Sequence, residues 1–95
     1  MLVITKNAPD TTEAKRGVKL ASAMSADIVL LQNSVYFSQG QKLADAGFRG
    51  KAYVLEDDML LRGLKTDDDS RNIEEINYDR LIDLMAEHDR VIGIF

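Results

Sequence analysis

The chain has 95 residues, of which 45% are hydrophobic and 29% are charged. This length and composition predict a single small globular domain over residues 1–95. The chain contains no cysteine and one histidine, which excludes disulfides, thiolate metal sites, a cysteine nucleophile and a multi-histidine metal site within one chain. We therefore expect no metal and no cofactor.

The net charge of −4 is unevenly distributed. Residues 1–50 hold six basic and four acidic residues, whereas residues 51–95 hold six basic and twelve acidic residues. An acidic half does not suit binding to a phosphate backbone, which needs clustered lysine and arginine. It suits a basic protein partner, or simply solubility, so we expect no direct contact with nucleic acid.

The beginning of the chain, "MLVITKNAPD", has no basic segment followed by a long apolar one. We read it as a first strand and not as a signal peptide. No apolar run approaches the roughly 20 residues that cross a bilayer. The expected location is therefore the cytoplasm, with no membrane contact.

In the first half of the chain, a strand over residues 2–5 precedes a helix that Asp10 or Thr11 caps and that runs to about residue 24. The next apolar run, over residues 28–31, predicts a second strand. Ser34 is then expected to cap a second helix that reaches about Ala46.

The second half repeats this alternation of apolar and amphipathic segments. Its predicted elements are a strand over 52–55, a short helix over 56–63, a polar loop over 65–72, a strand over 73–76, a helix over 78–88 and a strand over 91–95. The sequence "IEEI" at 73–76 has two adjacent carboxylates, which predicts an edge strand. Strands alternating with helices predict an α/β fold, a three-layer α/β/α domain with a five-stranded parallel sheet.

Several familiar sites are absent from the pattern. Asp57 and Asp58 follow the third strand, where receiver domains carry a phosphorylated aspartate, but the first strand ends in "TKNAPD" without the acidic pair that holds magnesium. We expect these carboxylates to lie at a helix N-terminus. Asp67, Asp68 and Asp69 do not fit an EF-hand loop, and no glycine-rich phosphate loop is present. His88, at the end of the last helix, is expected to be structural.

The remaining candidate is "QNSVYF", which follows the second strand. In parallel α/β sheets, ligands bind at the carboxyl ends of strands. Gln32, Asn33 and Ser34 can cap the next helix, or they can contact a partner or a small ligand. Tyr36 and Phe37 adjoin Val35, and three consecutive large residues cannot all face the sheet. We therefore predict that at least one is exposed or lies in an interface.

Gly40 falls in the middle of the expected second helix, where glycine costs about 1 kcal/mol relative to alanine. Its presence there suggests close packing.

Three segments together resemble the DsrH/TusB family, within the DsrE/DsrF/DsrH superfamily of sulfur-relay proteins. They are "VLLQNSVYF", with Ser34 in place of the usual glycine, "AYVLEDDMLLRGL" over Ala52–Leu64, and "INYDRLIDLM" over Ile76–Met85. They occur in the family's order and at its separations, and the resemblance covers nearly the whole chain.

The resemblance implies the strand order 4-3-2-1-5 and assembly with DsrE/TusD-like and DsrF/TusC-like sister subunits, with a DsrC/TusE-like sulfur carrier as a further partner. Such complexes pass persulfide sulfur towards 2-thiouridine at the wobble position of tRNA, or serve dissimilatory sulfur metabolism. The sulfur is carried on cysteine thiolates, chiefly in the DsrE/TusD-type subunit.

Some DsrH members carry a cysteine in the first helix, where this chain reads "KRGVKLASAM". A persulfide needs a thiolate, so this chain cannot carry the sulfur. The expected function is that of a non-catalytic, cysteine-free subunit of a sulfurtransferase complex. Its expected partner-binding residues are Gln32, Asn33, Ser34, Tyr36 and Phe37.

An alternative from a different class is a free-standing homo-oligomer that binds a small metabolite at the strand ends. Asn33 and Ser34 would then contact the ligand. A third possibility, an enzyme that acts through carboxylates alone, has no recognisable acid/base pair.

Overall fold

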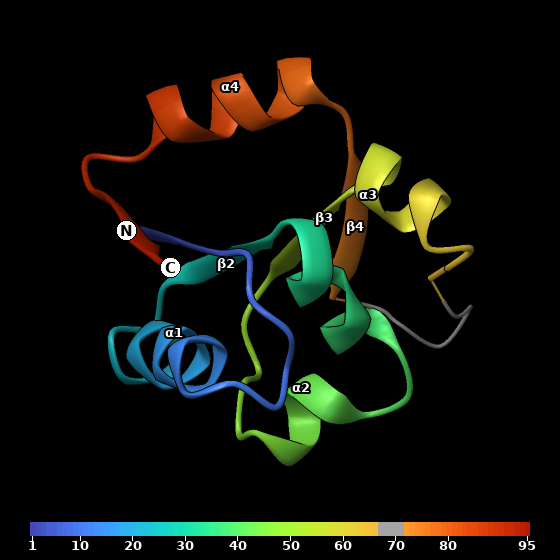
Figure 1. The fold of residues 1–95 in the computed structure, drawn as a ribbon. Helices are drawn as coiled ribbons and strands as arrows, with labels where there is room; N and C mark the ends of the chain where they lie inside the picture. The colour runs from blue at the N-terminus through green and yellow to red at the C-terminus, as the bar shows by residue number, and fades with distance from the viewer. Residues whose placement is uncertain (67–71) are drawn as a thin grey trace.

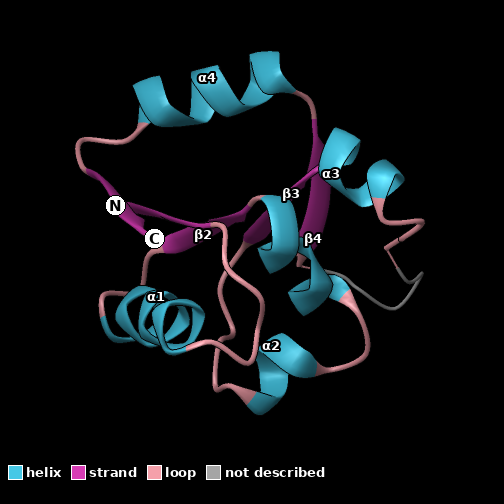
Figure 2. Cartoon of the chain, viewed as in Figure 1, coloured by secondary structure: helices cyan, strands magenta, loops and turns pink. Residues whose placement is uncertain are grey.

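The computed structural model describes residues 1–66 and 72–95, and it contains one parallel sheet with the strand order β4-β3-β2-β1-β5 (Figures 1 and 2). The strands are β1 (Leu2–Thr5), β2 (Asp27–Leu30), β3 (Ala52–Leu55), β4 (Ile73–Ile76) and β5 (Val91–Ile94). The helices are α1 (Thr12–Ala23), α2 (Lys42–Asp45), α3 (Glu56–Leu61), α4 (Tyr78–Glu87) and the 3₁₀ helix η1 (Gln32–Ser38). The predicted fold class and strand order are confirmed.

The direction of the strand connections decides which face each helix covers. From β1 to β4 the chain moves one strand at a time in one direction, whereas the step from β4 to β5 crosses back over the whole sheet. Because parallel crossovers are right-handed, the two directions place their helices on opposite faces. Figure 1 shows α4 alone on one side of the sheet, with α1 and α2 on the other.

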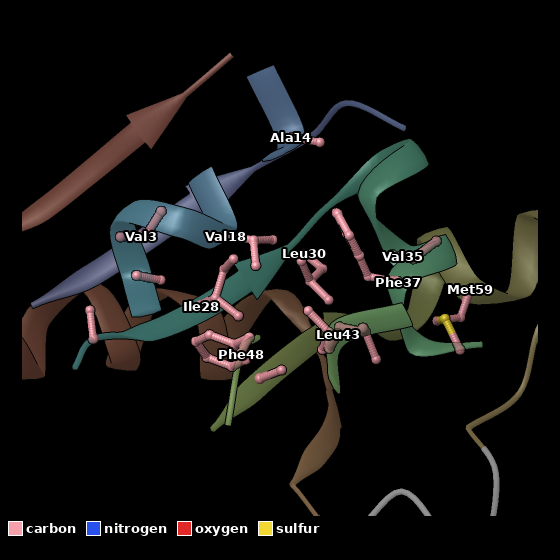
Figure 3. Packing of buried hydrophobic residues seen from close by; sticks show 14 residues of the cluster. Val3, Ala14, Val18, Ile28, Leu30, Val35, Phe37, Leu43, Phe48 and Met59 are labelled. Carbon is pink, nitrogen blue, oxygen red and sulfur yellow. The ribbon is translucent and has the colours of Figure 1, made fainter. Parts of the chain in front are cut away.

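Each face of the sheet has its own buried cluster. On the α1 face, strand residues such as Val3, Ile28 and Leu30 pack with Val18 of α1 and with Phe37 of η1 (Figure 3). On the α4 face, the cluster consists of Leu2, Ile4, Val29, Tyr53, Ile76, Leu81 and Leu84. Only two residues of this second cluster come from a helix, so the α4 face depends on one helix for its cover.

The edge position predicted for residues 73–76 is confirmed, because β4 pairs only with β3. Glu74 and Glu75 are exposed, and Glu74 forms an ion pair of 3.3 Å with Lys51. The predicted capping of the first helix is also confirmed, with Thr11 as the capping residue: its side chain accepts a hydrogen bond from the Ala14 N–H. Of the predicted polar loop, residues 67–71 lie outside the described residues, and they include the three consecutive aspartates.

The prediction of a continuous second helix from Ser34 to Ala46 is wrong. The segment divides into η1 and the four-residue α2, and Leu31, not Ser34, precedes the first turn. Gly40 lies between the two helices with φ of +59°, and a Cβ there would meet nothing within 4 Å. Glycine is therefore favoured at this position by its left-handed backbone conformation and not by close packing. The break lets η1 bury Val35 and Phe37 in the α1-face cluster.

A close approach between α1 and the sheet depends on Gly17. A Cβ atom at this position would overlap with the Thr5 methyl group, Cγ2. Thr5 is completely buried, so its side chain has little room to move away. The sequence pattern of α1 did not single out this glycine.

We expect Gly17→Ala to lower the free energy of unfolding by about 1–3 kcal/mol, the usual cost of adding a methyl group to a packed core. Adding Thr5→Ser to Gly17→Ala removes the opposing methyl group and should restore part of that loss. Urea unfolding of the two single variants and the double variant measures the coupling. Equal effects of Gly17→Ala with and without Thr5→Ser would contradict the contact.

Candidate functional site

The segment that follows β2 turns sharply at Gln32. This residue has φ of +48°, a left-handed conformation that a residue with a side chain adopts at a cost of roughly 1 kcal/mol. Its backbone N–H donates a hydrogen bond of 2.7 Å to Oδ2 of Asp58, which lies in the first turn of α3. Asp58 is buried. One carboxylate thus joins the carboxyl ends of β2 and β3 and holds the turn.

Arg62 extends this contact to the neighbouring side chain. Its Nε and Nη2 donate to Oδ1 of Asn33 at 3.1 and 3.0 Å, and its Nη1 donates to the carbonyl oxygen of Asp58 at 3.1 Å. Because arginine has no acceptor, the oxygen of the Asn33 amide must face it. The amide nitrogen of Asn33 has no partner among the described residues and remains able to donate to another molecule.

The two serines of η1 serve the fold. Ser34 is completely buried and donates to the carbonyl oxygen of Asn7 in the loop after β1. Ser38 is also buried and donates to the carbonyl oxygen of Val35 at 2.7 Å. The Ser34 bond ties η1 to the loop after β1, and the Ser38 bond closes the last turn of η1.

The structure separates the five residues that the sequence proposed as partner contacts. Gln32, Asn33 and Tyr36 are exposed, Tyr36 at 37% of its surface. Ser34 and Phe37 are buried within the chain and contribute to a surface here only by holding η1 in place. The prediction that at least one of Val35, Tyr36 and Phe37 is exposed is confirmed. The contact with a partner stays a prediction.

Asp58 and Arg62 were missed as site residues, because the sequence analysis expected Asp58 only to decorate a helix N-terminus. Their spacing of four residues is the usual signal for an ion pair on a helix, and their charged atoms lie 3.8 Å apart. The sequence does not show that both also reach Gln32 and Asn33. Next to them on α3, Leu60 and Leu61 are 80% and 81% exposed. Adjacent leucines this exposed give α3 an apolar surface of its own.

A separate cleft of about 660 Å³ lies on the α1 face, between α1 and α2. Val18 and Phe37 contribute apolar lining, and Lys15, Lys19 and Lys42 line it together with two aspartates.

Within residues 1–66 and 72–95, no group of three histidine, aspartate or glutamate side chains could hold a metal ion. His88 contacts the carbonyl oxygen of Leu84 at 2.7 Å through Nδ1, which fits the expected structural role.

We expect Asp58→Ala to lower the free energy of unfolding by about 1–3 kcal/mol, because it leaves the Gln32 N–H without its acceptor and removes the carboxylate that pairs with Arg62. Asp57→Ala is the matched control: this exposed neighbour on the same helix should change stability by no more than about 0.5 kcal/mol. Urea unfolding of both variants tests the difference. Similar losses for the two would show that Asp58 acts only on the helix dipole.

The fold and the family of this chain emerge from comparison with known proteins. The structure resembles the crystal structure of the YchN protein from E. coli, with a TM-score of 0.75, 16% sequence identity and coverage of 97% of both chains. At this identity the likeness establishes a shared fold. A search of curated protein sequences found no match. The model of the DsrH family, described as DsrH-like protein, matches residues 10–91. This match leaves out β1 and all of β5 except Val91, but it takes in the turn at Gln32, the Asp58–Arg62 pair and helices α1 to α4. It covers most of the chain, and the chain therefore belongs to the DsrH family.

Proposed function

We propose that this chain is a non-catalytic subunit of a sulfurtransferase complex of the DsrEFH/TusBCD type. The observation that carries the proposal is the combination of DsrH family membership with a sequence that has no cysteine. Persulfide transfer needs a thiolate on the carrier protein. The sulfur must therefore travel on other subunits, and this chain contributes a surface.

The proposed partner surface is centred on the exposed residues of η1. Asp58 and Arg62 hold the backbone at Gln32 and the side chain of Asn33, so little conformational freedom is lost there when a partner binds. Tyr36 offers an aromatic ring, a side chain that is enriched in interfaces. Leu60 and Leu61 supply apolar area on the adjacent helix α3.

The proposed partners are DsrE/TusD-like and DsrF/TusC-like sister subunits, together with a DsrC/TusE-like sulfur carrier. The complex would serve 2-thiolation of the tRNA wobble uridine, or dissimilatory sulfur metabolism. The acidic half of the chain supports a role without direct contact to tRNA. We propose a cytoplasmic location. No helix in the described part of the chain has both the length and the apolar character to cross a bilayer.

We expect Tyr36→Ala to weaken assembly with the sister subunits at least tenfold while leaving the unfolding temperature nearly unchanged, because the ring is partly exposed. Phe37→Ala, the matched control, should instead destabilise the fold by about 3–5 kcal/mol, since it empties a core position. Native mass spectrometry of the tagged chain recovered from its own host measures assembly, and thermal unfolding measures stability.

Recovery with two small α/β chains, one bearing a reactive cysteine, is the expected result for the unaltered protein. Recovery only as a homo-oligomer would contradict the proposed function. If Tyr36→Ala lost stability and assembly to the same degree, Tyr36 would belong to the fold and not to the partner surface.

The cleft between α1 and α2 favours a second candidate, a free-standing protein that binds a small organic anion. Its size is within the range of small-molecule sites, and it combines apolar lining with three lysines. The ligand would then lie against Phe37 and not against Asn33 and Ser34, because neither of those two residues lines the cleft. The chain could perform this function either as a monomer or as a homo-oligomer.

For this candidate, a thermal-shift series with small carboxylates and phosphate esters should raise the unfolding temperature of the unaltered chain. A ligand at about 100 times its Kd adds about 2.7 kcal/mol to stability. Lys19→Glu should abolish the shift, whereas Lys51→Glu, remote from the cleft lining, should leave it intact. The absence of any shift would rule out these ligand classes.

A further inference from the structure

Helix α4 carries apolar side chains on a flank that the rest of the chain does not cover. Leu81 and Leu84 are buried against the sheet. Tyr78, Ile82 and Met85 remain 56%, 64% and 43% exposed. Their spacing of four and three residues places the three on one side of the helix, in a stripe about two turns long. Exposed large apolar residues scattered singly are ordinary, but an aligned set of three marks an interaction surface.

The handedness of α4 shows which way this flank faces. α4 runs antiparallel to the strands, because it returns the chain from the carboxyl end of β4 to the beginning of β5, and Leu81 and Leu84 turn towards the sheet. In a right-handed helix with this direction, the flank that carries Arg80 lies towards β3 and β4. Successive helical residues turn by 100°, so Tyr78, Ile82 and Met85 project from the opposite flank, towards β1 and β5.

The sheet beside that flank is also uncovered. Gly93 of β5 pairs with Ile4, which belongs to the α4-face cluster. Phe95, two residues later, lies on the same face, and its ring occupies the space beside Gly93. This ring is 60% exposed, with Lys6 Nζ 5.1 Å from its centre. The stripe of α4 and the Gly93–Phe95 end of β5 thus form two sides of an open corner, here called the α4–β5 corner, on the face where Figure 1 shows a single helix.

We propose that the α4–β5 corner receives an amphipathic helix of a partner protein, whose apolar stripe is bordered by lysine or arginine. This helix would complete the second helical layer of the sheet. The inference rests on the proposed function in one respect, since it takes a sister subunit as the source of the helix.

The charges around the corner select this occupant over a second copy of the chain. Asp79 and Asp83 are exposed and lie on the outer side of the stripe, next to Ile82. Pairing α4 with α4 of another copy would bring these carboxylates close to their equivalents, and like charges across an interface are unfavourable. A helix with basic residues on the side of its apolar stripe that faces Asp79 and Asp83, away from Lys6, would instead pair with both aspartates.

The natural absence of cysteine allows a direct test, because one introduced cysteine is the only thiol. Ala86→Cys places it at an exposed position of α4 beside the stripe, and Ala23→Cys, on the exposed end of α1, is the matched control. Each purified variant is labelled with benzophenone maleimide, mixed with extract of its own host and irradiated. Mass spectrometry then identifies the cross-linked peptides.

The expected product from position 86, but not from position 23, is a peptide of another protein with helical apolar spacing and at least two basic residues beside the stripe. Adding Ile82→Lys should reduce this product at least tenfold, and thermal unfolding verifies that the variant still folds. Cross-links to a second copy of the chain, to peptides without this pattern, or none above the position 23 control would overturn the proposal. Cross-links of the expected kind to a protein unrelated to the sulfur-relay subunits would uphold the corner and contradict the proposed function.

Discussion

The hydrogen bond between the Gln32 N–H and the Asp58 carboxylate is the contact on which the geometry of the candidate site depends. Gln32 has a left-handed backbone conformation that costs energy, and the 2.7 Å bond to a buried acceptor offsets that cost. The same carboxylate lies beside Arg62, which in turn orients Asn33. Two turns at the ends of neighbouring strands are therefore held by one side chain, and η1 begins from a fixed point.

This arrangement suits a subunit that contributes a surface to a complex. A carrier of persulfide sulfur needs a reactive and accessible thiolate, whereas a docking surface needs side chains held in place before the partner arrives. Asp58 and Arg62 direct their polar atoms inward, to Gln32 and Asn33, and leave Tyr36 and the leucines of α3 exposed. The charged residues of the site position other groups, which agrees with a chain that has no cysteine to activate.

Sequence pattern predicted the parts of this fold that depend on local periodicity. Each short apolar run formed a strand, and the paired carboxylates of β4 placed it correctly at an edge. The prediction of a continuous second helix failed because Gly40 is compatible with two structures. A glycine at this position can pack closely within one helix, or it can form a left-handed turn between two helices, and only the tertiary structure distinguishes them. Gly17 and Asp58 were not recognised, since their partners Thr5 and Gln32 are distant in sequence. The exposed ring among residues 35–37 was foreseeable from crowding alone.

Helices cover the two faces of the sheet to different extents, and the topology of the chain explains why. Three crossovers bring α1, η1 with α2, and α3 to one face, whereas the single long crossover from β4 to β5 brings only α4 to the other. One helix of ten residues is about 15 Å long and 10 Å wide, too narrow to cover five strands that lie about 4.8 Å apart. The chain packs Leu81 and Leu84 of α4 against this face and leaves the β5 side to Phe95 and the exposed flank of α4. A parallel sheet is stable when both faces are covered, so this topology itself creates a place for a helix from another molecule.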